Sequence, residues 1–263
     1  MKLPQRLSLA LYKARLALRD PRRVAAARER RALRRENART LMHFHSEDYL
    51  TINGRRLEHL ASLGLPLEGR TVLEVGAGVG DLTSFFLARG CEVLSTEARP
   101  ASLRLLRERL PHVESALLDL DRPNEDWERT AEVVFCYGTL YHLREPAEAL
   151  AFLRRCCTDL LLLETCVSPG AGIDTNPEHE AAGSPTQAVS GIGCRPTRGW
   201  LLQELSRHFP HVYFTRTQPW HPQFPLDWSH PPAGLTRAIA VASLRSLAEP
   251  TLTSEIPERQ ERH

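Results

Sequence analysis

The chain has 263 residues, of which 42% are apolar and 25% are charged, and its formal net charge is +2. This length and composition suit a single α/β domain with an extension, and they exclude an intrinsically disordered chain. No apolar run reaches the roughly 18 residues that a membrane-spanning helix needs. Six cysteines without paired spacing predict reduced core residues in a cytoplasmic protein with no metal site: Cys91, Cys136, Cys156, Cys157, Cys166 and Cys194.

Positive charge is concentrated at the N-terminus. The first 40 residues hold 13 Lys and Arg residues and 3 acidic ones, a net charge of +10, so the rest of the chain sums to −8. We expect a helical extension over residues 1–58, with one amphipathic helix before Pro21 and another beginning there. The extension either binds an acidic partner, such as nucleic acid or an anionic membrane surface, or is a solvated arginine-rich helix. Charges interrupt its apolar part, which argues against a signal peptide.

Residues 43–49 form a dense polar and aromatic cluster between predicted helices. Ser46 is a suitable N-cap for the second helix, which carries Arg55, Arg56 and His59. The segment therefore either caps a helix whose charges face solvent or lies over a ligand site.

A glycine-rich turn is the most informative motif. Residues 71–75 predict a buried strand and residues 82–88 a helix. Three glycines stand between them and let a ligand lie against the backbone: Gly76, Gly78 and Gly80. Their G-x-G-x-G spacing differs from the dinucleotide fingerprint G-x-G-x-x-G, in which a helix N-terminus binds a pyrophosphate. Glu74 and Asp81 at the edges of the turn would repel a pyrophosphate, whereas they suit a ligand with an ammonium group and a ribose.

Acids also follow the next two predicted strands. Residues 91–97 predict a strand that ends in Glu97, which follows Gly78 by 19 residues. This approximates the spacing at which a carboxylate accepts hydrogen bonds from both ribose hydroxyls. After a helix over residues 101–110, residues 113–120 predict a third strand, which ends near Asp119. That aspartate either contacts the ligand or only begins a loop.

The second informative stretch surrounds a predicted strand over residues 133–136. Tyr141 and His142 follow its carboxyl end, at the edge where open α/β sheets bind ligands. A histidine there suits a general base, because its unperturbed pKa is about 6.5. Alternatively, His142 only orders the loop or touches the ligand. After a helix over residues 146–155, a fifth strand over residues 160–163 ends in Glu164 at the same edge.

The remainder of the chain changes character. Residues 168–196 lack periodicity, which indicates a lid or an irregular insertion, and we expect Glu178-His179-Glu180 within it to be solvated. The pattern then predicts a helix over residues 196–209 and strands over residues 212–217 and 238–243, with an aromatic loop between them. The main domain would thus span residues 59–247, followed by a flexible tail over residues 248–263.

Together, the glycine motif and the placement of the acids resemble the class I S-adenosylmethionine-dependent methyltransferases over roughly residues 60–245. The resemblance implies a Rossmann-like, seven-stranded, mostly parallel α/β sheet with helices on both faces and the last strand antiparallel. In that family an acid after the third strand contacts the adenine amino group, as Asp119 would. The resemblance implies cofactor binding by nine residues: Glu74, Gly76, Ala77, Gly78, Gly80, Glu97, Asp119, Leu120 and Tyr137.

A narrower likeness rests on the sequence from Tyr137 to Pro146 and the Leu-Leu-Leu-Glu-Thr run that ends at Thr165. These segments are similar to a branch that includes the bacterial tRNA wobble-uridine carboxymethyltransferase, which uses a carboxylated S-adenosylmethionine. No arginine that would recognise the extra carboxylate can be identified in the sequence.

The sequence therefore predicts methyl transfer to an oxygen or nitrogen of a small metabolite or sugar-like acceptor. His142 would take the acceptor proton, while Tyr141, Glu164 and residues 43–49 would line the acceptor pocket. One alternative is a tRNA-modifying methyl- or carboxymethyltransferase whose basic extension binds phosphates. Another is a non-catalytic subunit that binds the cofactor and serves in protein interactions.

Overall fold

The computed structural model describes residues 21–263. The chain divides into two compact units, residues 1–42 and residues 43–263. Helix α2 (Pro21–Phe44) begins with a proline, which is tolerated in the first turn because an N–H there lacks an intrahelical partner. The amphipathic helix that we predict before Pro21 lies outside the described residues.

The second unit begins earlier than the predicted domain boundary between residues 58 and 59. Helix α3 (Glu47–Ser62) belongs to this unit, and its Ile52 and Leu60 pack into one of the two hydrophobic cores. The hydroxyl oxygen of Ser46 accepts a hydrogen bond from the Tyr49 N–H, so this residue caps α3 as predicted. The extension and the main domain therefore meet near residue 42, because the apolar face of α3 needs the sheet to bury it.

The main sheet has eight strands in the order β11-β8-β10-β5-β4-β1-β2-β3. Strands β1 to β5 pair in parallel, whereas β10 is antiparallel to both of its neighbours, as the family resemblance implies. The seven predicted strands are all present, and the eighth is the short edge strand β11. The strands are β1 (Thr71–Val75), β2 (Glu92–Glu97), β3 (Glu114–Leu117), β4 (Ala131–Tyr137), β5 (Cys157–Val167), β8 (His211–Thr215), β10 (Thr236–Ser243) and β11 (Leu252–Thr253).

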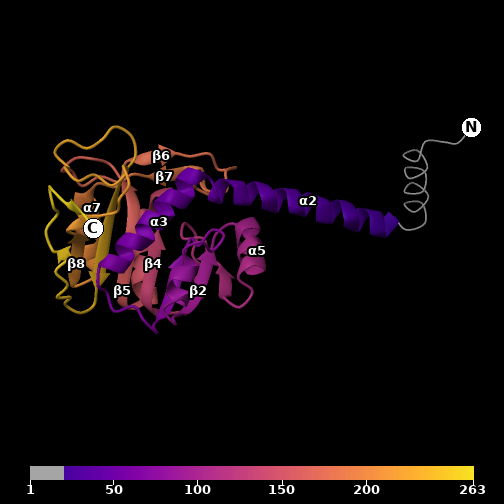
Figure 1. Cartoon of the computed structure of the whole chain (residues 1–263), viewed down its shortest axis with the longest axis horizontal. Coiled ribbons are helices and arrows are strands. Elements are labelled where there is room, and N and C mark those ends of the chain that lie inside the picture. Colours follow the sequence, from indigo (N-terminus) through magenta and orange to yellow (C-terminus); the bar gives the residue numbers. More distant parts are fainter. Residues whose placement is uncertain (1–20) are drawn as a thin grey trace, which may run out of the picture. The chain divides into compact units, whose positions relative to one another are not determined.

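Hydrophobic cores lie on both faces of the sheet, since successive strand residues point to opposite faces. Leu161 and Leu163 of β5 belong to one core, whereas Leu160 and Leu162 belong to the other. Helices α6 (Pro146–Cys156) and α7 (Arg198–His208) pack on the first core. Helices α3 and α4 (Thr83–Leu87) cover the opposite face, and Figure 1 shows α3 crossing β4 and β5. Helix α5 (Pro100–Arg109) connects β2 to β3.

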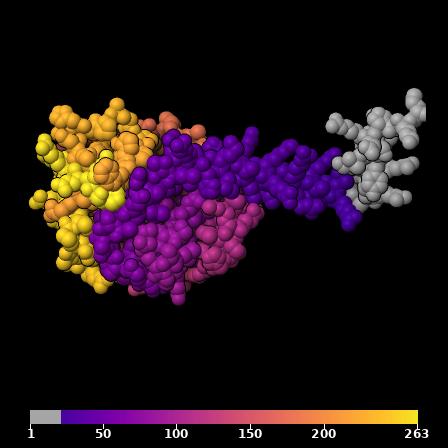
Figure 2. Space-filling model, viewed as in Figure 1, coloured from indigo at the N-terminus to yellow at the C-terminus, as the bar shows by residue number. Residues whose placement is uncertain are grey.

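Residues 248–263 are packed against the domain, in contrast to the flexible tail that we expected. Beyond β11, strand β12 (Glu261–Arg262) pairs with β9 (Thr217–Gln218). The Gln260 side chain is buried and donates a 2.5 Å hydrogen bond to the Thr215 carbonyl. Thr251 Oγ1 also donates to the Leu63 carbonyl at 2.8 Å, and Figure 2 shows the yellow C-terminal residues beside the purple α3 region. Pairing with distant strands holds this polar segment, which its own composition does not reveal.

The predicted insertion over residues 168–196 contains a small hairpin. Strand β6 (Pro177–His179) pairs antiparallel with β7 (Ile192–Cys194), and carbonyl groups in the segment between them accept hydrogen bonds from Arg99, just beyond β2. The six cysteines are free and buried, as predicted. Within residues 21–263, none of the helices has the length and apolar character needed to cross a bilayer.

Candidate active site

A cavity of about 650 Å³ lies at the carboxyl ends of β1, β2 and β4. The chain runs from β1 outward through β2 and β3 and then returns to β4 on the other side of β1, so the cavity stands where the strand order reverses. Backbone and side chains from six separate segments meet there. Its walls comprise Phe44, Tyr49, Val75, Gly76, Gly78, Glu97, Ala98, Arg99, Leu118, Asp119, Leu120, Asp121, Gly138, Thr139, His142, Leu143, Pro185, Thr186, Gln187 and Val189.

The glycine turn forms one wall of the cavity. Gly76 and Gly78 have φ values of +68° and +59°, which residues with a Cβ rarely adopt. A Cβ on Gly76 would also lie 2.2 Å from Thr139 Oγ1, and one on Gly78 would lie 2.5 Å from the Phe44 ring. Gly80 instead packs against Leu110, outside the cavity lining. Ala77 is likewise not in the lining, and its N–H donates to the Thr96 carbonyl at 2.8 Å.

Glu97 closes the end of β2 and lies in the cavity wall. Its Oε2 accepts a 2.9 Å hydrogen bond from the Gly78 N–H, and its Oε1 accepts a 2.8 Å bond from the Arg99 N–H. Burial raises the pKa of Glu97 to about 7, although these two N–H groups favour the ionised form. The carboxylate keeps further lone pairs for ligand hydroxyls.

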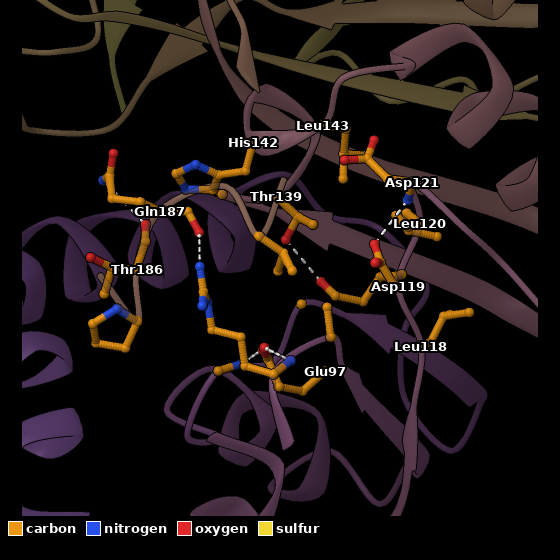
Figure 3. A pocket seen from close by; sticks show the side chains of 18 of the residues that line it. Glu97, Leu118, Asp119, Leu120, Asp121, Thr139, His142, Leu143, Thr186 and Gln187 are labelled. Carbon is orange, nitrogen blue, oxygen red and sulfur yellow. Dashed lines mark hydrogen bonds between the residues drawn. The ribbon is translucent and has the colours of Figure 1, made fainter. Parts of the chain in front are cut away.

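The loop after β3 forms the opposite wall. Figure 3 shows Asp119 and Leu120 on the side of the cavity away from Thr186 and Gln187. Asp119 Oδ1 accepts a hydrogen bond from the Asp121 N–H at 3.0 Å. Asp121 in turn accepts a 2.8 Å bond from the Arg144 N–H, which joins the start of α6 to this loop. The loop thus offers an acidic edge between the buried side chains of Leu118 and Leu120.

Glu74 lies inside the protein and not in the cavity wall. Its Oε2 accepts hydrogen bonds from Thr83 Oγ1 at 2.5 Å and Ser95 Oγ at 2.7 Å. Burial raises the pKa of Glu74, and the two hydroxyls oppose that shift. Asp81, the second acid of the motif, pairs with Arg109 at 2.8 Å. Both acids of the motif therefore hold the turn together and do not line the ligand cavity.

Glu164 and Tyr141 belong to a buried ionic cluster behind the cavity. Glu164 is fully buried and pairs with Arg56 at 2.9 Å and with Arg237 at 3.0 Å. Burial alone would raise the pKa of Glu164, but the two guanidinium groups hold it below its usual value. Arg237 also donates to Tyr141 Oη at 3.3 Å. Tyr137, which we predicted to bind the cofactor, has a buried hydroxyl group without a hydrogen-bond partner.

This arrangement differs from the predicted roles, because Tyr137, Tyr141 and Glu164 do not line the cavity. The cluster nevertheless adjoins it. A Cβ built on Gly138, which is in the lining, would lie 3.5 Å from the Arg56 guanidinium nitrogens. The Tyr141 ring packs 3.9 Å from the His142 ring, measured between centroids. Two arginines against one glutamate leave an excess positive charge behind this end of the cavity.

His142 lies in the cavity wall, on the short 3₁₀ helix η1 (Leu140–His142). Its Nδ1 lies 2.5 Å from Oε2 of Glu180, which directly follows β6. Burial lowers the pKa of His142, and the contact with Glu180 opposes that shift in part. Our expectation that Glu178, His179 and Glu180 are all solvated is therefore wrong for Glu180, whose side chain is only 2% exposed.

The tip of the hairpin insertion, residues 182–189, is held over the cavity, and we call it the lid tip. Arg99 donates hydrogen bonds of 2.9 Å to the carbonyls of both Ala182 and Gln187. Pro185, Thr186, Gln187 and Val189 contribute to the cavity wall. The insertion thus supplies one side of the site.

Several residues of the cavity wall are not recognised from the sequence. Arg99 and Asp121 stand two residues beyond Glu97 and Asp119, so their proximity to the strand ends is the signal that could have revealed them. Phe44 and Tyr49 fall within the segment that we predict to line the acceptor pocket. Residues 182–189 lie within the predicted lid or irregular insertion, but no local signal places Glu180 beside His142. Among residues 21–263, no group of three or more His, Cys, Asp or Glu side chains is placed to hold a metal ion.

Comparison with known sequences identifies the central part of the chain. Residues 73–159 match the family model described as a methyltransferase domain. A ubiquinone biosynthesis O-methyltransferase from Alkalilimnicola ehrlichii is 32% identical over 109 residues, which cover 38% of this chain and 42% of that protein. A ribosomal RNA small subunit methyltransferase A from Anaeromyxobacter sp. (strain K) is 44% identical over 54 residues, 20% of this chain and 19% of that protein. The matched stretches span less than half the length of either relative.

Comparison with solved structures extends the similarity to most of the chain. The N-terminal domain of EvdMO1, crystallised in the presence of SAH and D-fucose, has a TM-score of 0.58 at 20% identity, over 73% of this chain and 83% of that one. An S-adenosylmethionine-dependent methyltransferase from Mesorhizobium loti has a TM-score of 0.53 at 14% identity, over 72% of this chain and 97% of that one. At these identities the likeness is one of fold. The family match and the shared fold confirm the resemblance based on the glycine motif: residues 73–159 match a methyltransferase domain, and the chain has the fold of S-adenosylmethionine-dependent methyltransferases.

Proposed function

We propose that this protein transfers the methyl group of S-adenosylmethionine to an oxygen or nitrogen of a small acceptor. The observation that carries the proposal is a single cavity whose wall contains both the carboxylate of Glu97 and the imidazole of His142. The first is suited to hold a ribose, and the second is suited to remove a proton from an acceptor.

The residues of the cavity fit the cofactor. Gly76 and Gly78 present backbone without side chains, so a ligand can lie directly against the turn. Glu97 has lone pairs left for a ribose diol after accepting its two N–H bonds. Leu118, Leu120 and Asp119 offer apolar surfaces and an acceptor for the exocyclic amine of adenine.

The chain's own residues supply positioning, water exclusion and proton transfer. When bound, S-adenosylmethionine supplies a methyl group activated by its sulfonium. Glu97 and the glycine turn hold the ligand, while the lid tip covers the cavity and excludes water. His142 accepts the proton of the acceptor's hydroxyl or amine group at Nε2, because its Nδ1 faces Glu180. Proton removal increases the nucleophilicity of the acceptor oxygen or nitrogen.

The preference for a small acceptor rests on the covered cavity. The lid tip and Phe44 both form part of the wall, so space for the acceptor is bounded by the protein. The relatives agree with this choice, because one is named for ubiquinone biosynthesis and another was crystallised with D-fucose. A sugar or a phenolic metabolite has the hydroxyl groups that the histidine needs.

The cofactor part of the proposal is tested by calorimetry with S-adenosylhomocysteine, after native mass spectrometry of the purified protein. Glu97→Ala should weaken binding tenfold or more, in line with a loss of about 1.5–3 kcal/mol for hydrogen bonds to a charged group. Glu92→Ala, at the exposed opposite end of the same strand, is the matched control and should leave the affinity unchanged. Equal affinity in the Glu97 variant and the wild type would remove this carboxylate from the cofactor site.

The transfer step is tested with methyl-labelled S-adenosylmethionine and a panel of hydroxylated and amino metabolites. His142→Gln should reduce turnover by about 10²–10⁴-fold, the usual contribution of general acid–base catalysis. Its affinity for S-adenosylhomocysteine should stay within a few-fold of the wild type. Normal turnover of the histidine variant would exclude the imidazole as the base. Cofactor binding without transfer to any acceptor would favour the non-catalytic alternative.

An RNA acceptor is the second candidate, because helix α2 is strongly basic. Residues 22–39 carry eight exposed arginines and two glutamates: Arg22, Arg23, Arg28, Arg30, Arg31, Arg34, Arg35, Arg39, Glu29 and Glu36. Such a helix suits phosphate contacts, whose strength falls steeply with salt. The similarity to a ribosomal RNA methyltransferase over 54 residues points the same way.

RNA binding is measured with bulk tRNA at increasing salt. Replacing Arg30, Arg31, Arg34 and Arg35 with glutamine should weaken binding and reduce its salt dependence if α2 contacts phosphates. The cofactor affinity should remain unchanged. Binding that is absent in the wild type, or that does not depend on salt, would exclude the RNA acceptor.

A further inference from the structure

The contact between His142 and Glu180 joins the cavity wall to the hairpin insertion. The two residues are 38 positions apart, and their side chains are 15% and 2% exposed. His142 comes from η1, whereas Glu180 follows β6. The Glu180 carboxylate is thus almost fully enclosed, and one of its oxygens lies 2.5 Å from an imidazole nitrogen.

Three groups fix the Glu180 carboxylate in place. Its Oε2 accepts a 2.7 Å hydrogen bond from the Ala188 N–H in addition to the contact with His142. Its Oε1 accepts a 3.0 Å bond from Arg195. Burial would raise the pKa of Glu180, but these donors hold it below the usual value, so the group is ionised at neutral pH. An ionised carboxylate only accepts hydrogen bonds.

The hydrogen-bond roles of the imidazole follow from this carboxylate. Nδ1 must carry the proton, because the Glu180 oxygens have none to donate. The ring is buried among Tyr141 and the charged groups Glu180, Arg195 and Arg237, and its burial favours the neutral form. A neutral imidazole with a proton on Nδ1 has its lone pair on Nε2. That is the nitrogen that our proposed function requires to accept a proton.

The lid tip depends on the same carboxylate. Ala188 is fully buried, and its N–H shares Oε2 of Glu180 with the histidine. The guanidinium group of Arg99 donates a hydrogen bond to the carbonyl of Gln187 in the lid tip, while the backbone N–H of Arg99 donates to Glu97. The lid tip is thus connected both to the residue suited to bind ribose and to the residue suited to take the proton.

We propose that Glu180 is a positioning residue that holds His142 in the tautomer protonated on Nδ1 and couples this tautomer to closure of the lid tip. When the lid tip opens, Ala188 leaves Oε2, and the carboxylate that orients the imidazole loses one of its fixing contacts. The base is therefore set for proton transfer only when the cavity is covered. This inference rests on the proposed function in one respect, the role of His142 as proton acceptor.

The first experiment records the histidine ring nitrogens by NMR in the full-length, ligand-free protein labelled with ¹⁵N-histidine. His142→Gln identifies the resonances of His142. In the wild type we expect Nδ1 protonated and Nε2 unprotonated at neutral pH. Glu180→Ala should shift the ring toward the Nε2-protonated tautomer, whereas Glu180→Gln, which keeps a carbonyl acceptor, should retain the wild-type pattern in part. An unchanged tautomer in Glu180→Ala would overturn the proposal.

The second experiment measures amide hydrogen exchange of residues 182–191. Glu180→Ala should accelerate exchange there by about tenfold or more, as expected for the loss of a hydrogen bond to a charged group. Glu178→Ala is the matched control, because it lies on the same hairpin with an exposed side chain and should change neither the tautomer nor the exchange. Unchanged exchange in Glu180→Ala would overturn the coupling to the lid tip.

These readouts separate the inference from the proposed function. Neither needs an acceptor, so normal turnover of His142→Gln would exclude the histidine as the base while the tautomer result still decides the role of Glu180. If Glu180→Ala does not fold, the Glu180→Gln variant decides. A His142 tautomer and a lid-tip exchange rate that both equal those of the wild type would then overturn the proposal.

Discussion

The backbone N–H of Gly78 donates a 2.9 Å hydrogen bond to Oε2 of Glu97, 19 residues further along the chain. This bond joins the turn after β1 to the end of β2. Both residues lie in the cavity wall, so one contact joins two parts of that wall that come from different strands. It also places the Glu97 carboxyl group beside a glycine, which has no Cβ to cover it.

Gly78→Ala should damage both the turn and the site. The positive φ of 59° is unfavourable for alanine, and its Cβ would lie 2.5 Å from the Phe44 ring. We expect a loss of about 1–3 kcal/mol in the free energy of unfolding and a decrease of at least about tenfold in affinity for S-adenosylhomocysteine. Urea unfolding and calorimetry measure the two effects. Gly54→Ala in α3 is the control, because a Cβ there meets nothing within 4 Å and alanine favours a helix. A Gly78 variant with the same affinity for S-adenosylhomocysteine and the same free energy of unfolding as this control would contradict the strained-turn argument.

Cofactor binding should depend on pH through Glu97. Burial raises the pKa of this carboxyl to about 7, so a growing fraction is protonated as the pH falls below 7. Ribose hydroxyls donate to the ionised form, so binding below this pH requires loss of the proton. The affinity for S-adenosylhomocysteine should therefore rise as the pH increases and level off above about 7, with about a tenfold difference between pH 6 and pH 8.

Calorimetry at several pH values checks this dependence. Buffers that differ in ionisation enthalpy should also reveal proton release on binding at pH 6. Glu97→Gln cannot ionise, so its weaker affinity should lack the step near pH 7. If the wild type and this variant have the same pH profile, another group is responsible.

Glu164→Gln should strongly destabilise the protein. The wild-type carboxylate is the shared partner of the buried Arg56 and Arg237, and the variant leaves both guanidinium charges uncompensated. We expect a decrease of about 3–5 kcal/mol in the free energy of unfolding, measured with urea. The exposed pair of Arg55 and Glu58 is the control, since Arg55→Ala should change stability by less than about 1 kcal/mol. A small effect at Glu164 would mean that an acceptor other than this carboxylate balances the arginines.

His59 should make the folded state sensitive to acid. Its side chain is fully buried, its Nε2 lies 2.9 Å from the Thr217 carbonyl, and burial lowers its pKa to about 4. The unfolded chain takes up a proton near pH 6.5, whereas the folded state resists protonation until about pH 4. Stability from this residue is therefore present above pH 6.5 and falls by about 3 kcal/mol as the pH decreases to 4.

Urea unfolding of the wild type and His59→Gln between pH 4 and pH 7.5 tests this assignment. The glutamine amide can still donate to Thr217 but does not titrate, so the variant should lose less stability over this range. His230→Gln, at a side chain that is 87% exposed, should follow the wild type. Parallel curves for the wild type and the His59 variant would remove this histidine from the acid response.

The sequence alone determined the layered fold and one half of the site. Uninterrupted apolar runs predict buried parallel strands. Gly76, Gly78 and Glu97 all belong to one strand-turn-helix-strand unit, so local geometry brings these residues together. The position of His142 in the cavity wall also follows from its place just beyond a strand end. These predictions need only contacts between neighbouring elements.

Only the tertiary structure decided which side chains pair with one another in the other half of the site. Glu164 is 73 residues from Arg237, and Glu180 is 38 residues from His142, so neither pairing has a spacing that a sequence pattern can predict. A carboxylate in a polar segment resembles a solvated one until the fold buries it against a donor. Packing therefore determined which acids line the cavity, which stabilise the protein behind it, and which of them holds the histidine.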